Sequence, residues 1–202
     1  MTPAGESAMS EKEKLIEDIL ELELAMFLNV RSRYPASCQE NPDAFRFHRR
    51  AQFSVWSEET LLSYLDDLFK AKEQGHNLMT LKYARMENLI PPLNGNPIID
   101  VIVQMQLEAQ REMFSRYPNI LGQGRPLEND SLGATSFKTY LRGELETYSD
   151  RTLNLLYRDI QQVKDRGENW AQQLYTNLAR NLGYSSLNEL EETLRKKTLS
   201  DG

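Results

Sequence analysis

One stretch of polar side chains has the spacing of a single helix face. Tyr140, Glu144 and Tyr148 follow one another at intervals of four residues, and residues four apart are neighbours on a helix. Such a face can orient a ligand, with Glu144 as acid or base and Tyr140 or Tyr148 as hydrogen-bond donor. The alternative is an ordinary half-exposed face in which Arg142 pairs with Glu144. Both interpretations stay open at this point.

A second group combines basic and aromatic residues between positions 45 and 56. It includes Arg49, Arg50 and Trp56, and arginine can grip a carboxylate or phosphate through two parallel hydrogen bonds. The group is therefore a candidate anion-binding site. The alternative is a set of salt bridges between helices, which the many Asp and Glu residues would supply.

Four further residues are candidates for chemistry. Lys82 lies beside Tyr83, and such a lysine could form a Schiff base or tune a proton donor; the alternative is a solvated lysine. Arg125 lies in the glycine-rich segment GQGRP, which follows no strand and so does not predict a nucleotide-binding loop. We expect a loop that presents Arg125 to a ligand. The lone Cys38 cannot form an internal disulfide, and it is either a reactive thiolate or an inert thiol.

Composition narrows the class of protein. The 202 residues carry a formal charge of −6, which opposes nucleic-acid binding. No apolar run approaches the roughly 20 residues of a membrane span, and the N-terminus lacks an apolar signal core, so we expect a cytoplasmic protein. His48 has no glutamate three residues before it, so the two histidines of the chain cannot supply the two Glu-x-x-His pairs of a carboxylate–histidine metal site. We expect no metal and no cofactor.

The second half of the chain repeats the first at an offset of 92 residues. Identical residues recur along the two copies, and the matched pairs include Phe45/Phe137, Arg50/Arg142, Ser57/Ser149, Asp67/Asp159, Gly75/Gly167 and Asn77/Asn169. This pattern predicts two helical units with an approximate internal two-fold axis. A ligand site between packed units is then expected, because small-molecule sites prefer such clefts.

Helical periodicity dominates the sequence, and cap residues and glycines mark helix ends. The predicted fold is all-α, with about nine helices in one globular domain. The expected parts are a flexible tail (1–10), a first repeat (11–88), a linker (89–96), a second repeat (97–185) and a C-terminal helix and tail (186–202). Residues 117–134 are expected to form a long loop.

Several strings are distinctive in combination: SYLDDL (63–68), GHNL (75–78), KYARM (82–86), GQGRP (122–126) and SFKTYLRGELETYS (136–149). Together they resemble the uncharacterised bacterial family called domain of unknown function 4125. The resemblance covers about residues 15–190. It implies an all-helical, cytoplasmic protein and no established activity.

Two functional hypotheses follow. In the first, an anionic or zwitterionic metabolite binds between the repeats. The residues that bind the metabolite would be Arg49, Arg50, Arg125, Arg142, Tyr148 and Trp56. If the protein is a cofactor-independent lyase, hydrolase or isomerase, the residues that transfer protons would be Glu144, Tyr140, Lys82 and Tyr83. In the second, the chain is a non-catalytic interaction or assembly factor whose arginines and aromatic residues form a hot spot. The sequence does not decide whether catalysis occurs, and it leaves a homodimer open.

Overall fold

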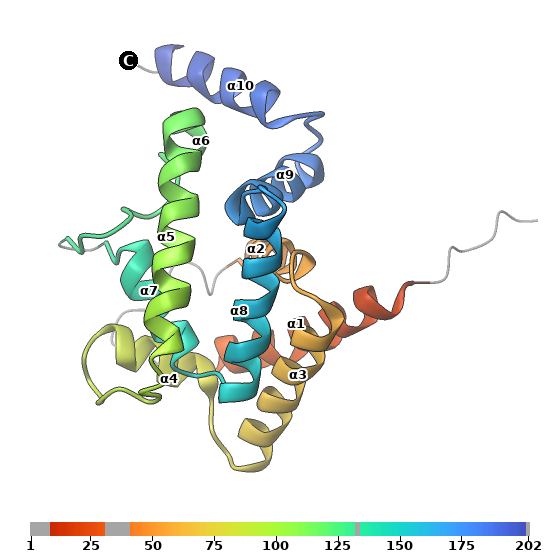
Figure 1. The fold of residues 1–202 in the computed structure, drawn as a ribbon, viewed down its shortest axis with the longest axis vertical. Helices are drawn as coiled ribbons and strands as arrows, with labels where there is room; N and C mark the ends of the chain where they lie inside the picture. The colour runs from red at the N-terminus through yellow and green to blue at the C-terminus, as the bar shows by residue number, and fades with distance from the viewer. Residues whose placement is uncertain (1–8, 31–40, 132–133, 201–202) are drawn as a thin grey trace, which may run out of the picture.

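The structure is a computed structural model that describes residues 9–30, 41–131 and 134–200. These residues form ten α-helices and no strand, which confirms the all-α class (Figure 1). The helices are α1 (Glu11–Leu28), α2 (Pro42–Ser54), α3 (Glu58–Glu73), α4 (Leu78–Met86), α5 (Ile98–Arg116), α6 (Pro118–Leu121), α7 (Phe137–Leu145), α8 (Asp150–Asp165), α9 (Trp170–Asn181) and α10 (Leu187–Ser200). The predictions about Cys38 and most of the N-terminal tail fall outside the described residues.

The short helix α6 was not expected, because it lies in the segment predicted as a long loop. Pro118 suits the first helical position, but Tyr117 before it provides no side-chain cap, unlike the cap residues that mark most of the other helices. Ile120 and Leu121 on this helix are buried and pack with residues of α5, α9 and α10. Tertiary packing therefore forms this turn of helix, which local sequence did not indicate.

Side-chain caps fix most helix starts. Ser57, Asn77, Ser149 and Asn169 each accept a hydrogen bond from the backbone N–H three residues ahead, which satisfies a donor that the helix leaves unpaired. Ser10 forms a full capping box with Glu13. These residues set where each helix begins.

Glycines end two corresponding helices. Gly75 and Gly167 both have φ of +70°, a left-handed conformation that costs glycine least. The next N–H then turns back to a carbonyl of the last turn, from His76 to Ala71 at 2.8 Å and from Glu168 to Val163 at 3.1 Å. The chain can thus reverse directly into the asparagine cap of the following helix.

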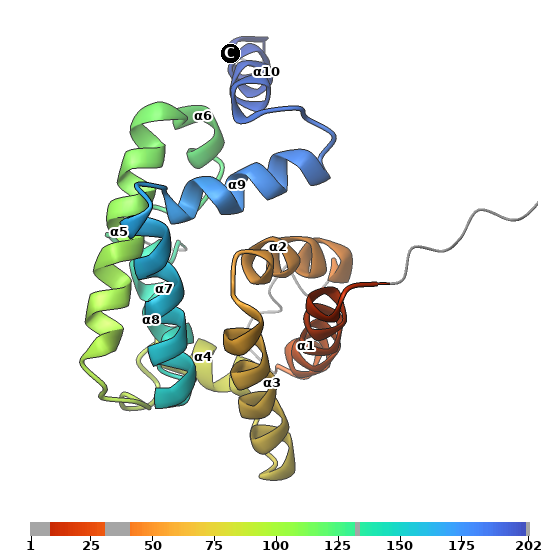
Figure 2. The same cartoon turned by 45° about the vertical axis from the view of Figure 1, so that its right-hand side comes forward.

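The helices of the two predicted units pack against each other. Helix α3 contacts α8, α2 contacts α9, and α4 contacts α7. Figures 1 and 2 show α5 and α8 running along the long axis, with α9 crossing above α2 and α10 at the end nearest α6. One hydrophobic core runs through both units, from α1 to the start of α9.

Two aspartates tie the units together reciprocally. Asp67 on α3 accepts from the Ser149 N–H at 3.0 Å and from the Thr152 hydroxyl at 2.7 Å, at the start of α8. Asp159 on α8 accepts from the matching groups at the start of α3, Ser57 N–H at 2.9 Å and the Thr60 hydroxyl at 2.6 Å. A duplicated unit would give such contacts, and the duplication itself stays a prediction from the sequence. None of the helices described is long and apolar enough to cross a membrane.

Candidate functional site

Four charged side chains meet in the core where α1, α2, α4 and α7 converge. Glu23 is 0% exposed, Arg49 4%, Lys82 2% and Glu144 2%. Isolated charges are expensive to bury, so buried charges must be paired and hydrogen-bonded. The formal charges of these four groups cancel, and we call them the buried ion network.

Arg49 links the two carboxylates of the network. Its Nε atom donates to Glu23 Oε2 at 2.7 Å, and Nη2 donates to the other oxygen of the same carboxylate. Its Nη1 atom donates to Glu144 Oε1 at 2.8 Å and to Gln52 Oε1 at 2.6 Å. A planar guanidinium suits this arrangement because its donors are fixed in a fork.

Glu144 is surrounded by donors on both oxygens. Lys82 Nζ lies 2.5 Å from Oε2, while the Tyr148 hydroxyl at 2.6 Å and Gln52 Nε2 at 2.9 Å reach Oε1 together with Arg49. On the Glu23 side, the Tyr64 hydroxyl donates to Oε1 at 2.6 Å. No buried side-chain nitrogen or oxygen among the described residues lacks a hydrogen bond. The network is internally satisfied.

The electrostatics of the network oppose acid–base work near neutral pH. Burial disfavours the charged form of Glu144, but the charges of Arg49 and Lys82 outweigh burial and hold its pKa well below the usual range. Burial also acts against charge on Lys82, yet Glu144 raises the pKa of Lys82 above its usual value. A general base should titrate near the working pH, and a Schiff-base lysine needs a lowered pKa. Neither residue meets its requirement.

Two tyrosines that donate hydrogen bonds to the network also have shifted pKa values. Burial, reinforced by a nearby carboxylate, raises the pKa of Tyr64 and of Tyr148 well above 10. Both hydroxyls stay protonated and donate to the carboxylates. The aromatic rings pack as a group, with Trp56 and Tyr148 at 5.9 Å between ring centres.

Tyr140 lies at the edge of the network and not on a free ligand face. Lys82 Nζ sits 3.6 Å from the centre of its ring and the Arg125 guanidinium 4.7 Å from it, distances typical of cation–π contacts. Arg125 also donates to the Thr135 carbonyl at 3.1 Å. The glycine-rich segment thus holds Arg125 against the protein.

Other predicted site residues lie elsewhere. Arg50 pairs with Glu17 and Arg142 with Asp100, both at partly exposed positions. Tyr83 packs near Phe27, with ring centres 6.4 Å apart. Arg50 and Arg142 therefore do not converge on Glu144, whereas Arg49, Lys82, Tyr140, Tyr148 and Trp56 gather around it. The aromatic patch proposed for a protein partner is not a single exposed surface, because Trp56 is buried and Phe45 stacks on Phe27 at 4.5 Å.

A cavity of about 70 Å³ adjoins Glu144 on the α9 side. Leucines and aromatic rings form most of its lining, together with the side chains of Gln52, Gln106 and Gln110. Its volume is below that of typical ligand sites, which run to roughly 300–1,000 Å³.

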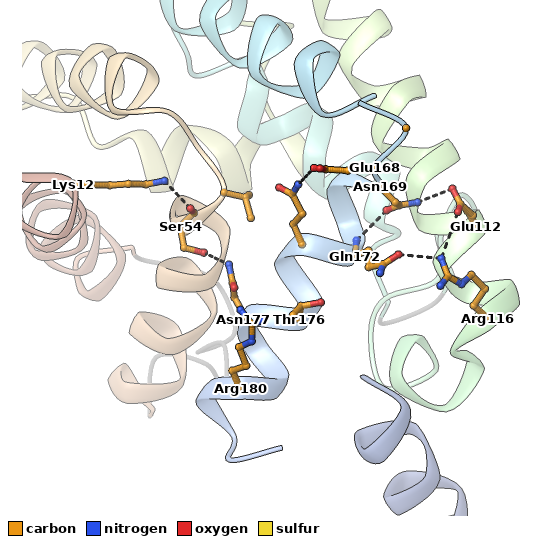
Figure 3. Close-up of a pocket in the computed structure, with 13 residues that line it drawn as sticks. Lys12, Ser54, Glu112, Arg116, Glu168, Asn169, Gln172, Thr176, Asn177 and Arg180 are labelled. Carbon is orange, nitrogen blue, oxygen red and sulfur yellow. Dashed lines mark hydrogen bonds and ion pairs between the residues drawn. The ribbon is translucent and has the colours of Figure 1, made fainter. Parts of the chain in front are cut away.

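A much larger groove lies on the opposite face of α9, open to solvent, with a volume of about 710 Å³ (Figure 3). We call it the outer groove. Its lining is almost wholly polar and comes from α1, α2, α5, α9 and the turn before α9: Lys12, Ser54, Val55, Glu112, Arg116, Gly167, Glu168, Asn169, Gln172, Gln173, Thr176, Asn177 and Arg180.

Hydrogen bonds hold one wall of the outer groove in place (Figure 3). Lys12 Nζ donates to the Ser54 carbonyl at 2.8 Å, and Asn177 Nδ2 donates to the Ser54 hydroxyl at 2.8 Å. Burial lowers the pKa of Lys12, although Asp159 and Glu58 oppose the shift. The junction of α1, α2 and α9 is therefore ordered around a half-buried cation.

The other wall carries the acidic groups. Asn169 Nδ2 donates to Glu112 Oε2 at 2.8 Å, and Arg116 Nη1 donates to Gln172 Oε1 at 2.9 Å. Gln173 Nε2 donates to Glu168 at 2.6 Å. The side chain of Arg180, by contrast, makes no hydrogen bond or ion pair with any residue that the structure describes, and Figure 3 shows it at the far end of the groove.

The sequence patterns did not predict that Glu23 and Tyr64 would lie with Arg49 and Glu144, and they did not predict the outer groove. A signal for Glu23 existed, since it lies four residues after Ile19 and three after Leu20, within an apolar helix face. A charged residue within an apolar helix face is expected to be buried and therefore to pair with a buried group of opposite charge. The outer groove has no comparable signal, because its lining comes from four separate helices and a turn.

Fold and sites together define an all-α protein with a buried ion network and a polar surface groove. The family described as "Protein of unknown function (DUF4125)" matches residues 13–192. The chain belongs to this family. No curated protein and no solved structure matches it significantly.

Proposed function

We propose that the protein binds a zwitterionic small molecule in the outer groove. The observation that carries the proposal is the groove's size and lining: about 710 Å³ with charged, carboxamide and hydroxyl side chains on both walls. That volume lies within the range of small-molecule sites. Carboxamides both donate and accept hydrogen bonds, so they suit a ligand with several amide or hydroxyl groups.

The charged residues along the groove determine the orientation of the ligand. Arg180 lies at one end, and Lys12 lies across the groove beside Ser54. Glu112 and Glu168 lie at the other end, where Arg116 and Arg166 pair with them and offset part of their charge. A ligand carboxylate would bind near Arg180 and a ligand ammonium near Glu168. The path along α9 from Asn169 to Arg180 is about 17 Å at 1.5 Å per residue. An extended chain of four or five residues spans roughly 13–18 Å at about 3.3–3.6 Å each, which is comparable, so a short peptide is a fitting probe.

The buried ion network serves this proposal as a support. It ties α2 to α1 and α7, and the C-terminal end of α2 with the residue after it supplies Ser54 and Val55 to the groove. Proton transfer by Glu144 or Lys82 is not part of the proposal, given the direction of their pKa shifts. The acidic composition with a single cysteine supports a cytoplasmic setting.

Tetraglycine tests the proposal because it is a zwitterion without side chains. Titration followed by ¹H–¹⁵N NMR should shift the side-chain amides of Gln172, Gln173 and Asn177. Arg180→Glu should weaken binding about fivefold, since an exposed ion pair contributes up to about 1 kcal/mol. Arg195→Glu, on exposed α10, is the matched control and should bind normally. Equal affinity for tetraglycine blocked at both ends would contradict the proposal.

A further inference from the structure

A smaller recess continues from the acidic end of the outer groove. Its volume is about 130 Å³, and it shares Glu112, Glu168 and Asn169 with the groove. The hydrogen bond from Asn169 to Glu112 lies at this shared boundary. Asn169 Nδ2 also donates to the Ala109 carbonyl at 3.2 Å, which ties the start of α9 to α5. The boundary is therefore a fixed feature of the fold.

The recess differs from the groove in chemistry. Beyond the shared residues its lining is mainly apolar, with Met105 and Ala109 from α5, Ile160 from α8 and Trp170 from α9. Two charged residues also line the recess, Lys164 and Glu108, whose side chains form an ion pair at 3.7 Å. An apolar cavity of about 150 Å³ accepts a benzene ring. The recess therefore has room for a branched aliphatic side chain.

We propose that the ligand of the outer groove carries an apolar group next to its ammonium, and that this group occupies the recess. The inference rests on the proposed function, because Glu112 and Glu168 are both the acidic end of the groove and the edge of the recess. The ligand class is then a short peptide, or a similar zwitterion, whose amino-terminal residue is apolar. An apolar group at the carboxylate end would lie among Thr176, Asn177 and Arg180 and gain nothing.

Three tetrapeptides separate position from composition: Gly-Gly-Gly-Gly, Leu-Gly-Gly-Gly and Gly-Gly-Gly-Leu. Their affinities for the wild-type protein can be measured by the same NMR titration. The amino-terminal leucine should improve affinity about tenfold or more over tetraglycine, because each apolar carbon group in a matching pocket contributes substantially. The carboxy-terminal leucine should leave affinity unchanged. Trp170, which lines the recess, should change its fluorescence with Leu-Gly-Gly-Gly and not with Gly-Gly-Gly-Leu.

Ala109→Leu supplies the matched variant, because the added side chain would fill the recess and leave the groove open. It should abolish the advantage of Leu-Gly-Gly-Gly and preserve tetraglycine binding. Equal affinity of the wild-type protein for all three peptides would overturn the inference while the proposed function stands. Equal gains in affinity from leucine at either end would overturn the inference too. This comparison uses the wild-type protein only, so it does not depend on whether Ala109→Leu folds. If none of the peptides binds, the proposed function and the inference fail together.

Discussion

Neutralising Lys82 should destabilise the protein more than any surface change, because it would leave the buried ion network with a net negative charge. Arg49, Lys82, Glu23 and Glu144 are each at most 4% exposed, and their formal charges cancel. Lys82→Met keeps a similar side-chain length and removes one positive charge. Breaking a buried pair by removing one partner costs about 3–5 kcal/mol. We expect Lys82→Met to lower the free energy of unfolding by that amount at neutral pH.

Glu144→Gln should cost about the same, because it leaves a net positive charge in the same volume. The double variant restores neutrality. It should therefore be less destabilised than the sum of the two single variants by about 2 kcal/mol or more, at the upper end of couplings between contacting residues. Urea unfolding followed by circular dichroism gives the three differences, provided that the slopes against denaturant stay equal.

Additive costs would contradict a pairwise interaction between Lys82 and Glu144. If Lys82→Met and Glu144→Gln simply sum, the 2.5 Å contact between Nζ and Oε2 carries no pairwise energy, and the network is an accident of packing. A single-variant cost below about 1 kcal/mol would refute it as well, since that is the value of exposed pairs. Lys70→Met provides the matched control, because Lys70 pairs with Asp66 at a largely exposed position.

Three further predictions concern stability and can be checked by the same unfolding measurements. Asp67→Ala and Asp159→Ala should each lower the free energy of unfolding by about 1–3 kcal/mol, because each leaves a helix-start N–H and a hydroxyl without their acceptor. Unequal effects would show that the two aspartates do not make equivalent contributions. Gly143→Ala should destabilise by about 1–3 kcal/mol despite alanine's better helix propensity, because its Cβ would lie 2.8 Å from Met86 Cγ and 3.3 Å from the Lys82 carbonyl oxygen; increased stability would contradict the close packing of α4 on α7. Glu144, whose folded pKa is lowered, contributes stability above its unfolded pKa of about 4.3 and loses it as pH falls further. The wild type should therefore lose more stability below that pH than Glu144→Gln, and parallel pH profiles would contradict the assigned shift.

Much of the fold was predictable because its signals are local. Asparagine and serine caps place helix starts within about two residues, and the positive φ of Gly75 explains one helix end. Helix α6 has no local cap, since Tyr117 before it makes no side-chain cap hydrogen bond, and its N–H groups at Asn119 and Ile120 donate instead to Glu191 of α10. Its existence depends on packing against α10, which the sequence does not display.

The site was predictable only in part. Arg49 and Arg50 are adjacent in sequence, yet they face about 100° apart on a helix. Arg49 shares the apolar register of Phe45 and Phe53, which could have identified it as the buried one. Arg50 instead reaches Glu17. The outer groove depends on how four helices meet, so no local pattern could have indicated it.

A native mass spectrum recorded with tetraglycine shows whether the outer groove binds a zwitterion. We expect a one-to-one complex with the wild-type protein, a weaker one with Arg180→Glu, and an undiminished one with Arg195→Glu. No complex with the wild type, or complexes of equal intensity for wild type and Arg180→Glu, would contradict binding in the outer groove.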